Sequence, residues 1–311
     1  MANVRDRWIR ALVPAAIALP LQSFPGAALC SSTTQHSTVR VMTFNVLHDG
    51  AWALAPSWGA RRRVVAEAIR SARPDVACLQ EVSPRQLDDL SLNLVEYRVF
   101  PGTLSGGTTL TGWARPGAFF GRLFLGDFFD HGEYCPIFVR RGFGAPTDSG
   151  AFLLARDSPT PHVVNWVRIR LPSEAFVDVF STHLGLVRGR TNGTQDDLLR
   201  LLDDHWSGTQ ILAGDLNALP SGPLLKSLVG VGAPRARAFQ DVWTGARLGG
   251  ARGGTLHWGL GLPGPRLDYV LVRPPCTIDS VRIAGTRVGR ILPSDHYAVV
   301  ADLRIGDPNG R

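Results

Sequence analysis

Side chains capable of acid–base and metal chemistry follow one apolar, strand-like segment after another along this chain of 311 residues. An α/β scaffold presents its reactive groups at strand ends, on loops that a rigid sheet positions. The recurrence therefore predicts a metal-dependent site assembled from several strand ends. The residues that carry this pattern are Asn45, Glu81, His183, Asp215, Asn217, Asp268, Asp295 and His296.

The segment Asp215-Leu-Asn217 combines a carboxylate with an amide two positions later. In a strand-like backbone, residues two apart point to the same side, so both groups would face one site. The carboxylate can orient and deprotonate a water, and the amide can donate to a developing oxyanion. An ordinary Asp-x-Asn turn with side-chain capping explains the same residues equally well.

Two histidines have acidic residues that could orient them. Asp268 is the candidate partner of His296, whose tautomer it would fix and whose pKa it would raise. Glu133 is the corresponding candidate for His183, although a histidine satisfied within the core is the alternative for that position. Asp295 precedes His296, and neighbouring side chains on a strand point to opposite faces. Asp295 could therefore reach a metal or its waters while His296 contacts a phosphate.

Glu81 is the first candidate metal ligand, because Mg²⁺ takes oxygen ligands and usually only one or two protein carboxylates, with waters and substrate phosphate completing its shell. Asn45 could hold a metal-bound water or the phosphate. Each residue alone also fits a plain surface position after a strand. Only the set as a whole predicts a metal site.

The elements that must position these groups follow from hydrophobic periodicity. A strand is predicted at 39–46, a helix at 61–73 that Pro74 stops, and a strand at 76–79, which is the order of a layered α/β protein. Residues 101–132 are predicted to form a long loop over the site that sets substrate choice. Its apolar part, 113–129, could touch lipid, cover a small substrate or pack against the neighbouring sheet. Further strands are expected at 137–139, 152–155, 163–169, 176–180, 211–213, 267–272 and 297–305, and a second helix at 196–205.

Composition places few limits on the partner. The net charge is +7 and the pI about 9.9, which is compatible with a polyanionic substrate. Lys226 is the only lysine, however, so genome composition explains the arginine bias as well. Cys30, Cys78, Cys135 and Cys276 have no zinc-binding or disulfide-framework spacing, and at most one bridge is expected among the last three.

The amino terminus is typical of a targeting segment. Basic residues at Arg5, Arg7 and Arg10 precede an apolar stretch over 11–21 that is too short and too interrupted for a good spanning helix. We expect residues 1–30 to be a signal peptide of an exported protein, secreted or periplasmic; an N-terminal membrane anchor is the alternative. One domain is expected over 39–305, because its motifs would be split by any cut, and 306–311 would be a tail.

Taken in order, the motifs resemble the endonuclease/exonuclease/phosphatase superfamily, the fold of DNase I. The resemblance covers about residues 39–305 and rests on seven ordered motifs. These are Thr-Phe-Asn45, Gln-Glu81, Glu133-Tyr-Cys-Pro-Ile-Phe, Thr-His183-Leu, Gly-Asp215-Leu-Asn217, Asp268-Tyr and Ser-Asp295-His296.

The resemblance implies an α/β fold, a four-layer sandwich in which helices flank two packed mixed or antiparallel sheets. It also implies Mg²⁺- or Mn²⁺-dependent hydrolysis of a phosphate ester, foremost a phosphodiester. Glu81 would bind the metal, with Asn45 and Asp295 nearby. Asp215 and Asn217 would position the water and the phosphate. The pairs His183–Glu133 and His296–Asp268 would supply proton transfer and stabilise charge.

Departures from the family pattern limit the substrate. DNase I has an arginine where this chain has Ser83 and a groove-reading tyrosine where it has His131, which argues against duplex DNA. Arg188 and Arg190 could clamp a substrate phosphate or simply begin a solvated helix. Nucleic acid, a lipid headgroup and an inositol phosphate remain the candidate substrates. A non-catalytic binding protein on this fold is the rival, against which the complete motif set argues. No obligate protein partner is evident, and we expect a monomer.

Overall fold

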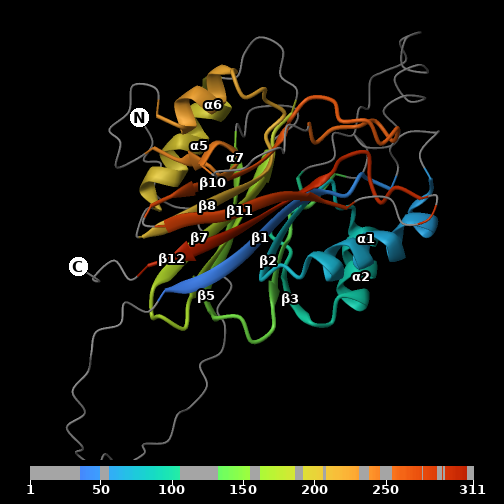
Figure 1. Ribbon diagram of the computed structural model, residues 1–311, viewed down its shortest axis with the longest axis horizontal. Coiled ribbons are helices and arrows are strands. Elements are labelled where there is room, and N and C mark those ends of the chain that lie inside the picture. Colours follow the sequence, from blue (N-terminus) through green and yellow to red (C-terminus); the bar gives the residue numbers. More distant parts are fainter. Residues whose placement is uncertain are drawn as a thin grey trace, which may run out of the picture.

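Two six-stranded β-sheets pack face to face, and helices cover the outer face of each (Figure 1). The computed structural model describes residues 36–49, 56–105, 132–154, 162–185, 192–205, 208–230, 238–245, 254–274, 276–285, 289 and 291–306. The two packed sheets and their flanking helices confirm the predicted four-layer α/β sandwich. None of the helices in these ranges is long and apolar enough to cross a membrane.

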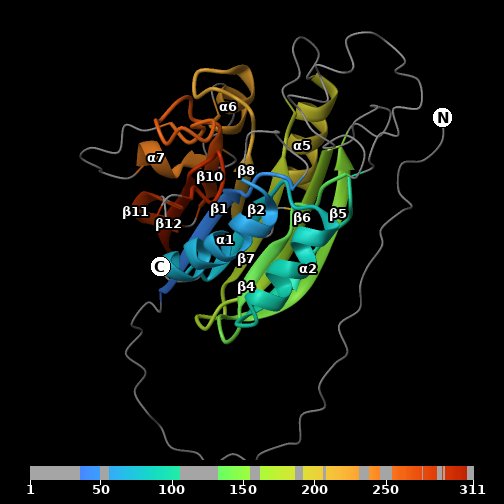
Figure 2. The ribbon, with the colours of Figure 1, turned by 90° about the vertical axis from the view of Figure 1, so that its right-hand side faces the viewer.

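The first sheet has the strand order β11-β12-β1-β2-β4-β3. Its strands are β1 (Ser37–Asn45), β2 (Val76–Gln80), β3 (Tyr97–Phe100), β4 (Ile137–Arg140), β11 (Cys276–Ala284) and β12 (Ala298–Ile305). Helices α1 (Trp58–Ala72) and α2 (Pro84–Asn93) cover its outer face (Figure 2). Ile69 and Leu90 of these helices pack with Met42 and Phe44 of β1.

The second sheet has the order β5-β6-β7-β8-β10-β9. Its strands are β5 (Ala145–Leu154), β6 (His162–Arg170), β7 (Phe176–His183), β8 (Thr209–Asp215), β9 (Gln240–Asp241) and β10 (Asp268–Arg273). Helices α5 (Asn192–Asp204) and α6 (Pro223–Leu228) pack on its outer face through Leu198, Leu202 and Leu225, and α7 (Val242–Gly245) is a single turn. Between the sheets lies a valine-rich core in which Val41 and Val76 meet Val179 and Ile211.

One pair of parallel neighbours occurs in each sheet, and this detail positions the site. β1 runs parallel to β2, and β7 runs parallel to β8. The carboxyl ends of parallel strands meet at one edge, so each sheet brings two motif-bearing ends together there. β10 and β12 run antiparallel to β8 and β1, so their first residues arrive at the same edge.

The predicted elements occur with shifted bounds, and others went unpredicted. The first helix ends at Ala72, and Arg73 adopts the left-handed conformation as its C-cap instead of continuing the helix. The unpredicted elements are α2, β3, α6, α7, β9, β11 and residues 145–151 of β5. Cys78 lies buried in β2, and the described cysteines Cys78, Cys135 and Cys276 are all free.

Candidate active site

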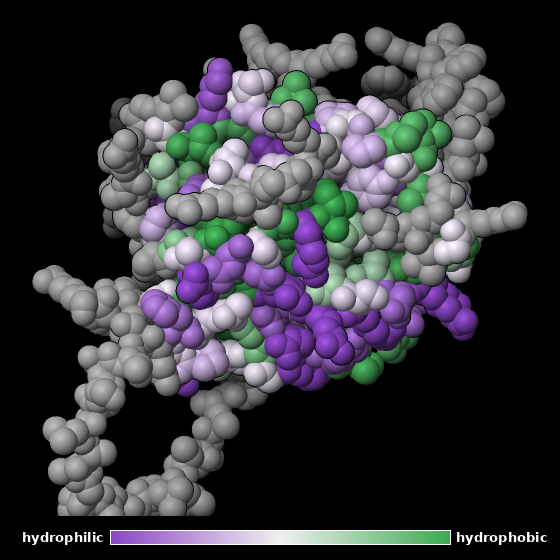
Figure 3. Space-filling model, viewed as in Figure 1, coloured by the Kyte–Doolittle hydropathy of each residue, from purple (hydrophilic) through white to green (hydrophobic). Residues whose placement is uncertain are grey.

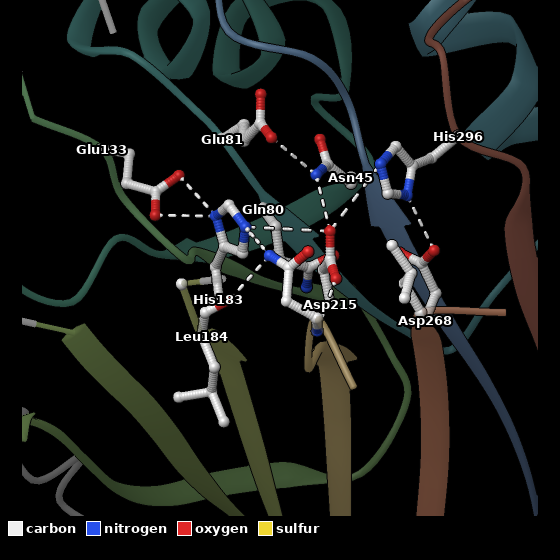
Figure 4. A network of polar contacts seen from close by, with 12 residues as sticks. Asn45, Gln80, Glu81, Glu133, His183, Leu184, Asp215, Asp268 and His296 are labelled. Carbon is white, nitrogen blue, oxygen red and sulfur yellow. Dashed lines mark hydrogen bonds and ion pairs between the residues drawn. The ribbon is translucent and has the colours of Figure 1, made fainter. Parts of the chain in front are cut away.

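Strand ends from both sheets converge on the carboxylate of Asp215, the last residue of β8 (Figure 4). Its Oδ2 accepts a hydrogen bond from Nδ2 of Asn45, at 3.1 Å, across the gap between the sheets. Its Oδ1 accepts one from the backbone N–H of Asn217, at 2.9 Å. The glycine before it permits this close packing, since a Cβ at Gly214 would lie 2.1 Å from the carbonyl oxygen of Thr182.

Two imidazoles approach the same oxygen of Asp215. Nε2 of His183 lies 3.7 Å from Oδ2, and Nε2 of His296 lies 3.8 Å from it. Burial raises the pKa of Asp215, the nearby charge of Asp268 raises it further, and the two histidines offset only part of this, so the pKa is about 6. Asp215 is therefore ionised at neutral pH but is within reach of protonation, which suits a group that exchanges a proton with water.

His183, at the end of β7, is held by Glu133. Its Nδ1 lies 2.9 and 3.0 Å from the two oxygens of that carboxylate. Burial alone would lower the pKa of His183, but Glu133, Asp215 and Glu81 outweigh burial and raise it to about 10. On the opposite side of the ring, Nε2 lies 3.1 Å from Nδ2 of Asn217, whose amide also donates to the carbonyl of Leu184 at 2.7 Å.

The two neighbours of His183 Nε2 favour opposite protonation states. An N–H of Asn217 needs the lone pair of a neutral ring, whereas the carboxylate of Asp215 favours a proton on Nε2. The same nitrogen thus has a partner in either state. This arrangement suits a histidine that passes a proton during a reaction.

His296 forms a second pair of the same kind with Asp268. Its Nδ1 lies 2.8 Å from Oδ2 of Asp268, which is fully buried at the start of β10 and opposite Asp215 in the ladder. Burial opposes the charged imidazole, but Asp268, Asp215 and Asp295 outweigh it and hold the pKa of His296 well above its ordinary value. The expected pairs His183–Glu133 and His296–Asp268 are thus both in contact.

The predicted metal ligands surround a neighbouring part of the site. Oε1 of Glu81 accepts from Nδ2 of Asn45 at 2.8 Å, and Oε2 accepts from the backbone N–H of His48 at 3.0 Å. Glu81 has a positive φ of 58°, so its turn after β2 carries backbone strain of the kind that gathers at functional sites. Burial and the charge of Glu81 raise the pKa of Asp295, despite the opposing effect of His296.

The chemistry of these donors fits a hard divalent cation. Glu81, Asp215, Asp268 and Asp295 are carboxylates crowded into one largely buried region, and Oδ1 of Asp268 is buried without a hydrogen-bond partner. Among the described residues, Asp215, Asp268 and His296 also place ligand-type atoms within 4.8 Å of one another. A bound cation would be held by Glu81 with Asn45 and Asp295 nearby, and would offset this repulsion and polarise a phosphoryl oxygen.

Nine of the predicted site residues therefore lie in one connected region. They are Asn45, Glu81, Glu133, His183, Asp215, Asn217, Asp268, Asp295 and His296. Arg188 and Arg190 lie outside the described residues, as do His131 and the aromatic part of the 101–132 segment.

Sequence reasoning missed a buried arginine that fixes the loops of the site. Arg61 of α1 is 2% exposed, and its guanidinium donates to the carbonyl oxygens of Val46 at 2.7 Å, Leu47 at 2.9 Å and Pro293 at 2.9 Å. It thereby joins the segment after Asn45 to the segment before Asp295. The available signal was a charged residue in helical register with Val65, on the face predicted to be buried.

The family comparison agrees with this geometry. The model of the Endonuclease/Exonuclease/phosphatase family matches residues 42–296, a range that contains all nine residues of the connected region. The chain belongs to this family. Membership places it among hydrolases of phosphate esters. The comparison with curated protein sequences gave no match.

Solved structures show the same fold in other members. A Bacteroides vulgatus endonuclease/exonuclease/phosphatase is 21% identical, with a TM-score of 0.71 over 86% of this chain and 99% of that one. A mannosyl-6-phosphatase from Bacteroides thetaiotaomicron is 18% identical, with a TM-score of 0.64 over 85% and 99%. TDP2 from D. rerio, complexed with a single-strand DNA product, is 18% identical, with a TM-score of 0.63 over 86% and 99%.

Proposed function

We propose that this protein is an exported, Mg²⁺- or Mn²⁺-dependent phosphodiesterase that works through two histidine–carboxylate pairs. The observation that carries the proposal is the approach of two such pairs to one carboxylate, with Nε2 of His183 and of His296 at 3.7 and 3.8 Å from Asp215. A phosphodiester bound there would have a base on one side and imidazole donors around it. Phosphoryl transfer depends on this positioning and on neutralised charge.

Each residue has a defined part in the proposed reaction. Asp215 orients a water and accepts its proton as the water oxygen bonds to phosphorus. Asn217 and His183 donate to the non-bridging oxygens, on which charge accumulates. The ester P–O bond breaks, and the leaving alkoxide takes a proton from His296, which Asp268 orients. The products are a phosphate monoester and an alcohol. A bound cation, held by Glu81 with Asn45 and Asp295, would add charge neutralisation.

The test is hydrolysis of a panel with and without Mg²⁺: plasmid DNA, single-stranded RNA, sphingomyelin and an inositol phosphate. Metal-dependent turnover of one of the three diesters, lost in His296→Ala and kept in His36→Ala, would support the proposal and name the substrate. Turnover of the inositol phosphate alone, which is a monoester, would contradict the diesterase and favour a phosphatase. His36 is exposed and belongs to no part of the site. Absence of metal binding would contradict the enzymatic function and favour a non-catalytic binding protein.

Export and a monomeric state belong to the same proposal. The basic residues and apolar stretch before residue 30 support export, and N-terminal sequencing of the secreted and membrane fractions would separate cleavage from anchoring. Sedimentation velocity would test the monomer. A lipid headgroup is the second candidate substrate, because the exposed Leu260 and Leu262 belong to a loop that forms a β-bridge with His296.

A further inference from the structure

Exposed hydrophobic side chains gather beside the candidate active site. Among the described residues, seven large hydrophobic side chains are exposed, and four of them belong to two loops next to the catalytic motifs. Leu219 follows Asn217, and the other three lie between residues 254 and 266, before Asp268. We call these four the apolar rim: Leu219, Trp258, Leu260 and Leu262, which are 53%, 47%, 69% and 71% exposed.

The loop that carries most of the rim is fixed to the site by hydrogen bonds. The backbone N–H of His257 donates to the carbonyl of Asp295 at 2.8 Å, and Leu256 forms a β-bridge with His296. Oγ1 of Thr255 accepts from the N–H of Asp268 at 3.1 Å. The hydroxyl of Tyr269 donates to the carbonyls of Ala218, at 2.6 Å, and Arg266, at 3.1 Å, and so joins the two loops. The rim therefore has a set position beside the catalytic groups.

Part of the backbone of this loop is hydrogen-bonded within the protein near its tip. The N–H of Leu260 donates to the carbonyl of His257 at 2.9 Å, and that of Gly264 donates to the carbonyl of Leu256 at 2.8 Å. Gly261 accepts from the hydroxyl of Tyr297 at 2.7 Å. These bonds lower the cost of bringing the loop tip close to an apolar medium.

Trp258 combines a strained backbone conformation with a partly exposed side chain. Its φ is +49°, which is rare for a bulky residue and marks backbone strain. The ring lies over Gly264, where an added Cβ would be only 2.5 Å from Cζ3 of the indole. Tryptophan is favoured where one end of a side chain is in lipid and the other in water.

The composition and shape of the loop indicate what it meets. Residues 254–264 contain no Asp, Glu, Lys or Arg, in a chain of which 19% is charged. Leu260 and Leu262 are too exposed to line a pocket and instead project outward on either side of Gly261. Figure 3 shows hydrophobic surface at the upper right, where Figure 1 draws this loop. An exposed, uncharged apolar projection is typical of a membrane contact.

We propose that the apolar rim inserts into a lipid surface and delivers the phosphodiester of a phospholipid headgroup to the site. The substrate part of this proposal rests on the proposed function, whereas the membrane contact does not. Insertion would bury Leu260 and Leu262 in the outer part of the bilayer, with Trp258 at the boundary. Asp295, hydrogen-bonded to the base of the same loop, and His296, bridged to Leu256, would then lie on the headgroup side of it.

Binding to phosphatidylcholine vesicles, measured by co-sedimentation of the full chain, tests the contact. The double variant Leu260→Ser/Leu262→Ser should bind at least about tenfold more weakly, because two buried leucines are lost. The control is Leu92→Ser/Val95→Ser, which changes two equally exposed hydrophobic residues (76% and 67%) at the end of α2 and just after it. Unchanged binding of the loop variant, or an equal loss in the control, would overturn the proposal.

A second measurement locates the contact. Brominated phosphatidylcholine should quench part of the tryptophan fluorescence, and Trp258→Phe should remove that part. Quenching unaffected by this substitution would exclude insertion of the loop. Sedimentation velocity tests whether a second copy of the chain binds the rim instead. A dimer abolished by Leu260→Ser/Leu262→Ser would make the rim an interface between copies and overturn the lipid contact.

Hydrolysis of the soluble diester bis(p-nitrophenyl) phosphate separates this proposal from the proposed function. The loop variant should keep the wild-type rate on this substrate, which also shows that it is folded, while losing activity on phospholipid vesicles. No turnover of any diester by the wild type would refute the proposed function and leave the vesicle-binding result standing. Equal losses on soluble and vesicle substrates would overturn delivery by the rim.

Discussion

At the scale of single residues, this site is an arrangement of carboxylates that set the charge of two histidines. Glu133 and Asp268 each contact the Nδ1 of one imidazole, and Asp215 lies between the two Nε2 atoms. Burial alone would lower the pKa of both histidines, because it favours the neutral ring. The neighbouring carboxylates therefore keep both imidazoles protonated, so that each ring can donate a hydrogen bond or a proton.

Removing the acid that faces His183 should reveal this control. In Glu133→Gln the pKa of His183 should fall from about 10 towards its ordinary value, because Glu133 is the largest influence that raises it. We expect kcat to fall about a hundredfold, the usual size of a lost donor to the charge that develops in the transition state. NMR titration of the imidazole would measure the pKa. An unchanged pKa would show that Asp215 and Glu81 alone keep the ring charged.

The acid limb of the pH–rate profile should belong to Asp215. Its carboxylate must be ionised to accept a proton, and its pKa of about 6 means that kcat/KM should fall about tenfold per pH unit below that value. A bound cation lowers the pKa of nearby carboxylates, so the midpoint should lie at or below 6 in the presence of metal. A midpoint above neutrality would assign the limb to another group.

At the scale of elements, helix α1 contributes to the site through one arginine. Arg61 donates to carbonyls on both sides of the proposed metal site, and burial lowers its pKa only to about 10, so it stays charged. Its role is to position the residues after Asn45 and before Asp295.

Arg61→Met should therefore weaken metal binding as well as the fold. Several buried carbonyls would lose their donor, at a cost of about 3 kcal/mol in the free energy of unfolding. We expect Mn²⁺ affinity, measured by calorimetry, to fall about tenfold, with Arg61→Lys intermediate. The neighbouring Arg62→Met, whose side chain is 43% exposed, is the control. Wild-type Mn²⁺ affinity in a folded Arg61→Met protein would contradict the positioning role.

Most strands, but not every helix and strand, could be predicted from the sequence. Apolar runs and motif order predicted most strands and the strand ends that meet, because each motif residue directly follows a buried segment. Helix α2 was missed although Ser83 and Gln86 form a capping box with Pro84 at its first turn, a readable signal. β11 was missed because its burial alternates only partly and a bulge interrupts it between Ile278 and Ser280.

Contacts between the sheets could not be predicted from the sequence. The amide of Asn45 bridges Glu81 of the first sheet region and Asp215 of the second, and Gln80 reaches Ser181 at 3.4 Å. These pairs are up to 170 positions apart. Only the packing of one sheet on the other decides them. The same is true of Arg61, whose partners are carbonyl groups that leave no mark in the residue types.

At the scale of the whole molecule, the site is a junction at which two sheets bring buried negative charge together. Asn45 and the two histidines offset part of the repulsion among Glu81, Asp215, Asp268 and Asp295. The pKa of Glu81 is lowered, but burial and neighbouring acids raise the pKa values of Asp215 and Asp295, so the offset is incomplete at these two residues. Such a junction trades stability for function.

Thermal unfolding should therefore respond to metal and to the loss of one acid in opposite ways. Because the folded-state pKa of Asp295 is raised, its charge at neutral pH destabilises the fold, and this cost is absent at acidic pH, below the pKa of the unfolded chain. With EDTA at neutral pH, Asp295→Asn should unfold at a higher temperature than the wild type. Mg²⁺ at about a hundred times its Kd should stabilise the wild type by about 2.7 kcal/mol and the variant by much less.

The control, Asp279→Asn, removes an exposed acid paired with Arg304 and should follow the wild type in both conditions. A lower unfolding temperature for Asp295→Asn in EDTA would mean that Asp295 stabilises the metal-free junction, and that cation binding is not what its burial serves.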